Sequence, residues 1–283
     1  MKRVYISAFV LSTLAGTIYA FLQVFQLSGK AADQGLIISW LGLAVALLMV
    51  FRFFGSLFLW RTPRTARIPI LETVSVLGAI LLSVIFQQGE ITGYSFMLLL
   101  GWAVYNVWYA RLDRPDAPKL GVGKEFPAAL SFRNADGSQV KAGDYLGKIN
   151  IWLFFRGNWC PLCMAQIKEV AAGYRELEAR GAQVILVSPQ SDRHTKWLSE
   201  QHEAPMVFLQ DVNAQAAKSL NIVAPDGTPL GMEVFGFQAD TVLPTVVITD
   251  AAGVIQWADQ TDDYRVRPEP STFLEVIDGF AAV

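Results

Sequence analysis

Four long apolar stretches occupy most of the first 110 residues, at residues 4–22, 36–59, 68–86 and 91–110. Each is close to the length of about 20 residues that an α-helix needs to cross the hydrocarbon core of a bilayer. Apolar residues occur all round the expected helices rather than along one stripe, which favours membrane spans over helices of a soluble bundle. The pattern therefore predicts a transmembrane region of four helices over residues 1–110.

Basic residues near the ends of these stretches predict the orientation, because Lys and Arg are enriched on the cytoplasmic side of a membrane. If all four stretches span, three basic clusters share one side, namely Lys2 and Arg3, then Arg61, Arg64 and Arg67, then Arg111, Arg114 and Lys119. Lys30 is the one basic residue of the opposite loops. The first stretch lacks a clear small-x-small cleavage site, so we expect a retained anchor. We expect an integral protein of a bacterial inner membrane, with the N-terminus and all residues after the fourth stretch in the cytoplasm.

Two charged residues interrupt the apolar stretches. Arg52 lies inside the second stretch, so either the helix ends near Phe51 or the Arg52 side chain reaches toward the interface. Glu72 lies near the start of the third stretch, and we expect an interfacial carboxylate that pairs with Arg67 or with water.

The rest of the chain predicts a soluble domain in which strands and helices alternate. Residues 111–120 contain two prolines and mixed charge and are expected to form a linker. Asp136-Gly137 predicts the turn of a hairpin. Later strands are expected at 149–155, 184–187, 206–209, 245–248 and 254–257, and helices at 164–180, 192–201, 214–220 and 271–280. This order predicts one α/β layered domain over residues 121–283.

Composition and charge separate the same two parts. Apolar residues make up 53% of the chain and the mean hydropathy is +0.35, with the excess in the first 110 residues. That part carries seven basic and three acidic residues, whereas the rest carries 16 basic and 22 acidic residues. We therefore expect membrane lipid as a partner of the first part, and the acidic second part argues against nucleic acid.

The candidate chemistry lies in the only two cysteines, Cys160 and Cys163, which form a C-x-x-C directly after the apolar run 149–155. A helix that begins at these cysteines would lower a thiol pKa through its unpaired N–H groups and its dipole. Two cysteines at one site provide no structural disulfide framework and predict a redox-active Cys160–Cys163 disulfide. A zinc site would need four ligands, and only His194 and His202 supply imidazoles, so we expect no metal.

Two segments of the chain resemble the thioredoxin superfamily. They are Phe155-Arg156-Gly157-Asn158-Trp159-Cys160-Pro161-Leu162-Cys163 and, later in the chain, Leu243-Pro244-Thr245. Over residues 121–283 the chain resembles more narrowly the redoxin branch, the alkyl-hydroperoxide-reductase/thiol-specific-antioxidant (AhpC/TSA, peroxiredoxin-like) family. The resemblance implies a thioredoxin-like fold, with a central mixed sheet and flanking helices. We recognise no family for residues 1–110.

The superfamily resemblance implies one assignment of the cysteines. Cys160 would be the attacking thiolate and the more exposed of the two, and Cys163 would resolve the mixed disulfide. Trp159 and Pro161 would shape the site beside them. Pro244 would match the cis-proline of the superfamily, in a loop that faces the disulfide.

The redoxin branch implies the opposite assignment. That family places Pro, Thr and the peroxide-attacking Cys at relative positions 0, 4 and 7, where this chain has Arg156, Cys160 and Cys163. Cys163 would then be peroxidatic and Cys160 resolving. The threonine is missing, and residues 241–244 lack the family's arginine, although Arg156 offers a positive charge. These departures favour thiol–disulfide exchange over peroxide reduction.

We therefore expect a membrane-anchored thiol–disulfide oxidoreductase. One alternative is a peroxiredoxin-like thiol peroxidase with an antioxidant role. Another, of a different class, is a redox sensor coupled to the membrane helices. The expected partners are a thiol or disulfide protein, or a peroxide, together with an electron-donating thiol reductant. No organic cofactor is implied, since the disulfide itself carries two electrons.

Overall fold

The computed structural model describes residues 1–28, 33–59 and 69–281 and divides into two compact units. The first contains Met1–Leu59 and Ala66–Arg111, and the second contains Leu112–Val283. Part of the predicted orientation rests on residues outside the described ranges, namely Lys30, Arg61, Arg64 and Arg67.

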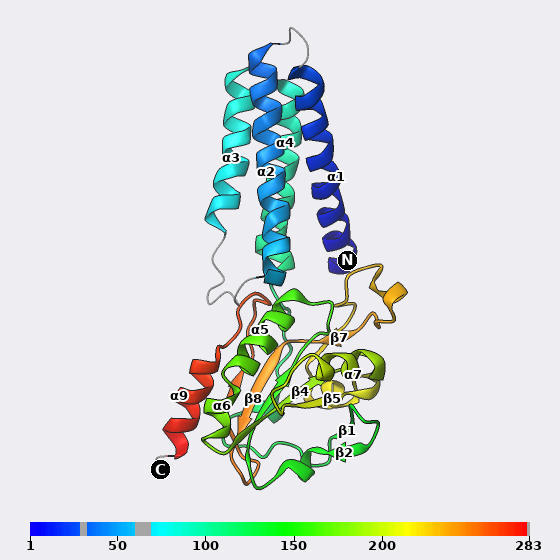
Figure 1. The fold of residues 1–283 in the computed structure, drawn as a ribbon, viewed down its shortest axis with the longest axis vertical. Helices are drawn as coiled ribbons and strands as arrows, with labels where there is room; N and C mark the ends of the chain where they lie inside the picture. Colours follow the sequence, from blue (N-terminus) through cyan, green and yellow to red (C-terminus); the bar gives the residue numbers. More distant parts are fainter. Residues whose placement is uncertain (29–32, 60–68, 282–283) are drawn as a thin grey trace. The chain divides into compact units, whose positions relative to one another are not determined.

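The first unit consists of helices that run side by side as a bundle (Figure 1). These are α1 (Lys2–Ser28), α2 (Gln34–Leu59), α3 (Ile70–Ile85) and α4 (Gly89–Val104), followed by a π-helical turn, η1 (Tyr105–Tyr109). The prediction of four helices in this part of the chain is confirmed, whereas their predicted role as four membrane spans stays a prediction. By length and composition, two helices are long and apolar enough to cross a membrane, namely Lys2–Ser28 and Gln34–Gly55, and Ile70–Ile85 is a shorter apolar helix.

Arg52 and Glu72 form an ion pair that ties α2 to α3. The Arg52 guanidinium donates to the buried Glu72 carboxylate at 2.9 Å. Helix α2 continues through Arg52 to Leu59, so the alternative in which it ends near Phe51 is wrong. The partner of Glu72 is therefore a residue of the preceding helix. Helices α2 and α3 pack against each other, which brings Arg52 close to Glu72. Arg67, the partner expected from the sequence, lies outside the described residues.

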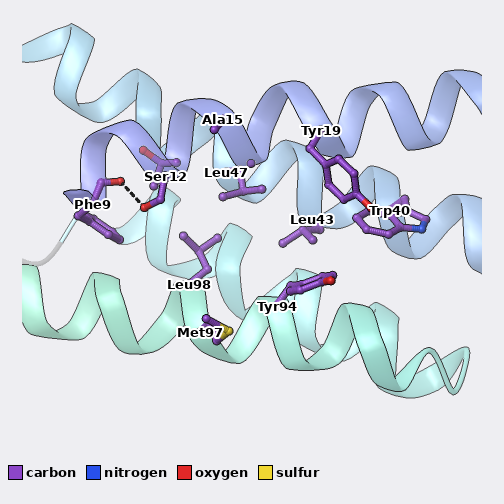
Figure 2. A pocket seen from close by; sticks show the side chains of 12 residues that line it. Phe9, Ser12, Ala15, Tyr19, Trp40, Leu43, Leu47, Tyr94, Met97 and Leu98 are labelled. Carbon is purple, nitrogen blue, oxygen red and sulfur yellow. Dashed lines mark hydrogen bonds between the residues drawn. The ribbon is translucent and has the colours of Figure 1, made fainter. Parts of the chain in front are cut away.

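The outer surface of the bundle and one cavity in it are both apolar. Large side chains such as Phe25, Met97 and Leu100 point outward, which is unusual for a surface in contact with water. A cavity of about 470 Å³ lies between α1, α2 and α4 and is lined by rings that include Tyr19, Trp40 and Tyr94 (Figure 2). Its lining contains no cysteine or histidine, so it offers no thiol or imidazole for redox chemistry.

The second unit is built on a mixed seven-stranded sheet in the order β2-β1-β5-β4-β3-β8-β9. The strands are β1 (Ser131–Asn134), β2 (Gln139–Lys141), β3 (Ile149–Phe154), β4 (Ala182–Ser188), β5 (Val207–Gln210), β8 (Thr245–Thr249) and β9 (Ile255–Asp259). The central strands β3, β4 and β5 are parallel, and β8 and β9 are antiparallel to their neighbours. A short pair, β6 (Val223–Ala224) and β7 (Thr241–Val242), forms a separate ladder. This is the predicted thioredoxin-like arrangement.

Helices cover the sheet, and the central strands are buried on both faces. The helices are α5 (Pro161–Ala172), α6 (Tyr174–Glu178), α7 (Asp192–Glu200), α8 (Gln215–Leu220) and α9 (Pro270–Ala281), with α5, α6 and α9 lying together (Figure 1). Trp152 of β3 belongs to the same core cluster as the buried residues of α8 and stacks on Phe126 at a centroid distance of 4.8 Å. Neighbouring Ile151 and Leu153 point to the opposite face and are also buried, which explains the continuous apolar run of this strand.

The expected helix over residues 164–180 is divided between α5 and α6 at Gly173. A Cβ atom at Gly173 would lie 3.2 Å from a side-chain carbon of Pro270, the first residue of α9. The break lets α9 approach closely, a tertiary constraint that local periodicity does not contain.

The segment expected to be a linker packs onto the second unit. The Leu112 N–H donates to the Asp262 carbonyl at 2.6 Å, and the Asn221 side chain donates to the Asp116 carbonyl at 2.8 Å. Leu120, at the end of a short 3₁₀ turn (Pro118–Leu120), is buried in the same core as Trp152. Residues 112–120 are therefore an ordered part of the domain that they precede.

Candidate redox site

The two cysteines lie where the central strand β3 gives way to α5. Cys160 is the N-cap residue of α5, and Pro161 occupies its first turn, a position where the missing N–H of proline removes no helical hydrogen bond. Gly157 in the preceding loop has a φ of 143°, and a Cβ there would lie 2.9 Å from the Trp159 ring nitrogen. Only glycine at position 157 therefore allows the Trp159 ring to lie this close to the backbone of the loop.

Both cysteines are free thiols, and both are buried. Their sulfur atoms lie 2.8 Å apart. Cys160 is 2% exposed and Cys163 is 1% exposed. The structure thus brings together the predicted pair, but the expectation that Cys160 is clearly the more exposed thiol is wrong, because the surrounding loops cover both sulfurs.

The two thiols differ strongly in acidity. Burial alone would raise the pKa of Cys160. The pKa nevertheless falls to about 6, because it is lowered by the hydrogen bond from the Cys163 thiol, by the charges of Arg156 and Arg267, and by the Cys163 backbone N–H. For Cys163, burial and the neighbouring Cys160 raise the pKa well above that of an ordinary thiol. At neutral pH these shifts favour the thiolate form of Cys160 and the thiol form of Cys163.

Arg156 lies beside the thiolate, in a position that the sequence left open. The side chain is 7% exposed, and its guanidinium lies over the Trp159 ring, 4.8 Å from the centroid. It also donates to the Gly227 carbonyl, while the Thr241 hydroxyl donates to the Arg156 carbonyl at 2.6 Å. Trp159 and the segment around Gly227 thus hold a positive charge near Cys160.

Arg267 is the functional candidate that the sequence pattern did not identify. It is 3% exposed, and its charge lowers the pKa of both cysteines. One terminal nitrogen donates to the Val266 carbonyl at 2.9 Å, but Nε and Nη2 have no hydrogen-bond partner among the residues that the structure describes. Buried N–H donors are rarely unpaired, so these two are available to an oxygen atom that enters the site.

The loop that carries Arg267 is held by a buried ion pair. The Arg265 guanidinium donates to the Asp263 carboxylate at 2.7 Å, and both side chains are buried. The sequence pattern predicts no role for this loop, although residues 263–268 contain three charged residues, Asp263, Arg265 and Arg267.

Pro244 lies at the same end of the sheet, but its peptide bond is trans. Thr245 pairs with Phe154 across β8 and β3, which places Pro244 beside the start of the cysteine loop. No cis peptide bond occurs within residues 1–28, 33–59 and 69–281. The expectation that Pro244 is a cis-proline is therefore wrong. The Leu243 N–H donates to the Ile222 carbonyl at 2.7 Å, and the chain passes from β7 directly into β8.

The histidines do not join the cysteines. His194 stacks on Phe237 at a centroid distance of 4.1 Å, and His202 packs near Phe208. Within the described residues, no three side chains of the types His, Cys, Asp and Glu lie close enough to hold a metal ion.

Comparison with known proteins places the resemblance in the second unit. A family model described as the AhpC/TSA family matches residues 122–258. The peroxiredoxin Bcp of Bacillus subtilis is 26% identical over 123 residues, which are 43% of this chain and 76% of that protein.

Two solved structures are also similar. AhpC of Mycobacterium tuberculosis is 20% identical with a TM-score of 0.46, over 58% of this chain and 94% of that chain. A Cys-to-Ser mutant of the peroxiredoxin 6 of Arenicola marina is 17% identical with a TM-score of 0.49, over 57% and 73% of the two chains.

Ultraviolet titration of the thiolate in the reduced full-length chain tests the electrostatics of this site. We expect thiolate absorbance to appear with a midpoint near pH 6 and to be lost in Cys160→Ser, since the charged form is held by Arg156 and Arg267. Arg267→Gln should raise the midpoint by about one pH unit, because one cation is lost. Arg180→Gln, which breaks an exposed pair with Asp278, serves as the control. A wild-type midpoint above about 8, as in a free thiol, would contradict the assignment.

Proposed function

From the premise that residues 122–258 form a domain of the AhpC/TSA family, and that the chain is therefore an oxidoreductase, we propose that it is a thiol peroxidase working through Cys160 and Cys163. The observation that carries this proposal is the burial of both sulfurs, at a site where the charges of Arg156 and Arg267 lower the pKa of Cys160. A small hydroperoxide needs only a narrow approach to a buried sulfur. A protein disulfide would have to bring its own backbone to a thiol that is 2% exposed.

This burial reverses the preference that the sequence suggested. The missing threonine and the missing arginine at 241–244 favoured thiol–disulfide exchange over peroxide reduction. In the folded chain, however, Arg267 provides unpaired buried donors near the sulfurs from a different segment. The positive charge that peroxide reduction requires is therefore available without an arginine at 241–244.

The proposed reaction begins with the Cys160 thiolate. Its sulfur attacks one peroxide oxygen, so that an S–O bond forms and the O–O bond breaks. The departing alkoxide or hydroxide takes a proton and leaves as an alcohol or as water. Arg156 and Arg267 stabilise the negative charge that moves from sulfur to oxygen.

Cys163 completes the turnover. Its sulfur displaces the oxygen of the Cys160 sulfenic acid, the S–S bond forms and the S–O bond breaks, and the oxygen leaves as water with the Cys163 proton. The sulfur separation of 2.8 Å requires little movement for this step. The thiol pair loses two electrons and the peroxide gains them, and an external thiol reductant returns two electrons and two protons.

Peroxide consumption by the two single cysteine variants tests the roles. Cys160→Ser should lose activity to the background level, because the thiolate is removed. Cys163→Ser should consume one equivalent of peroxide and stop as a sulfenic acid that a dimedone-type probe traps, because no resolving thiol remains. A sulfenic acid on Cys163 in the Cys160→Ser variant, formed at the wild-type rate, would reverse the assignment.

We also propose that the helical unit anchors this peroxidase in a bacterial inner membrane, with the redox domain in the cytoplasm. Two helices of sufficient length and apolarity and the outward-pointing apolar side chains support the anchor. The basic clusters at Lys2 and Arg3 and at Arg111, Arg114 and Lys119 support the orientation. A reducing cytoplasm also suits a dithiol that must be returned to its reduced form.

Because the native thiols are buried, topology is tested with exposed cysteines in a chain that carries Cys160→Ser and Cys163→Ser. Glu200→Cys reports on the redox domain, and Glu90→Cys, at an exposed position in the first turn of α4, reports on the opposite side. With a membrane-impermeant maleimide in intact cells, we expect only Glu90→Cys to be labelled. Both should be labelled after permeabilisation. Labelling of Glu200→Cys in intact cells would overturn the orientation.

A further inference from the structure

Arg114 lies in the segment that follows the helical unit in the chain, and its guanidinium reaches the edge of the redox site. It is partly buried and donates to the carbonyls of Pro244 and Thr261 and, at 3.2 Å, to the Thr245 hydroxyl. Arginine suits this arrangement because its planar fork presents donors in several fixed directions. One side chain thus joins two turns that are distant in the sequence.

Both turns lead to the thiol pair. Thr245 pairs with Phe154, the last residue of β3 before the cysteine loop. Thr261 follows β9 and opens the loop that carries Arg267. The Leu112 N–H donates to the Asp262 carbonyl in the same loop at 2.6 Å, which adds a second attachment from the same segment.

Asp259 connects the two arginines electrostatically. Burial raises the pKa of this carboxyl, and attraction to Arg267 and then to Arg114 opposes the rise. Burial and repulsion from Arg267 lower the pKa of Arg114 to about 10, against attraction from Asp259 and Asp262, so Arg114 remains a cation at neutral pH. Arg267 is already the stronger of these two cations toward Asp259. Without Arg114, the Asp259 carboxylate would be balanced by Arg267 alone of the two, and less of the Arg267 charge would act on the sulfurs.

We propose that Arg114 is a positioning residue for the peroxidase site, which fixes the turns at Pro244 and Thr261 and shares Asp259 with Arg267, so that Arg267 stays directed at the thiol pair. It touches neither sulfur, so it acts through Arg267. This inference rests on the proposed function for its effect on turnover, but its effect on the thiolate can be measured without any peroxide.

The test compares Arg114→Gln, Arg114→Lys and Arg133→Gln in the full-length chain. Arg133 forms an exposed pair with Asp192 and is the matched control. Arg114→Gln should raise the ultraviolet titration midpoint of the thiolate by about one pH unit and lower kcat/KM for hydrogen peroxide at pH 6 by about fivefold, because the ionised fraction of Cys160 falls by that factor. Arg114→Lys, which keeps the charge but loses the fork, should fall between, and it replaces Arg114→Gln if that variant does not fold.

The variant Asp259→Asn serves as a second background, in which an effect of Arg114 through Asp259 can be told apart from a general loss of structure. If Arg114 acts by sharing this carboxylate, Arg114→Gln should have little effect on the thiolate midpoint in the Asp259→Asn background. An unchanged midpoint and rate in Arg114→Gln, in a chain whose wild type reduces peroxide, would overturn the inference and leave the function standing. A shifted midpoint in a chain that does not reduce peroxide would retain the positioning role and overturn the function.

Discussion

The attraction between the buried Cys160 thiolate and the guanidinium groups of Arg156 and Arg267 is the interaction on which the redox site depends. A thiol buried as deeply as Cys160 would ordinarily hold its proton more tightly. Here the opposing effects prevail, and the pKa falls to about 6. Much of the surrounding structure serves to keep these two cations in place, including the Trp159 ring over Arg156 and the Asp263–Arg265 pair in the Arg267 loop.

The same charges support the different roles that we propose for two chemically identical residues. Once Cys160 is ionised, its negative charge and the lack of solvent keep Cys163 protonated. Attack and resolution can then follow in a fixed order at one helix start. In the proposed function, burial also limits the substrate, because a thiol that is 2% exposed is less accessible to a folded protein partner than to a small hydroperoxide.

Local sequence patterns were sufficient to predict most elements of the redox unit. The Asp136-Gly137 turn, the apolar run of β3 and the C-x-x-C at the start of α5 depend on neighbouring residues, and the structure contains all three. What could not be predicted depends on residues far apart in the chain. Arg267 and Arg114 reach the site only because the loop after β9 and the segment 112–120 return to it. The trans bond at Pro244 is likewise a feature that the local pattern does not contain. The break at Gly173 is also a long-range feature, since it lies against Pro270, which is distant in the sequence.

The central claim is that one buried thiolate and its neighbouring thiol reduce a small peroxide as a closed two-electron unit. Its most direct test mixes the reduced full-length chain with equimolar hydrogen peroxide, without a reductant, and follows peroxide loss and thiol oxidation together. The account predicts one Cys160–Cys163 disulfide for each peroxide consumed, with both signals changing at the same rate. Peroxide that remains unconsumed, or peroxide loss without formation of this disulfide, would contradict it.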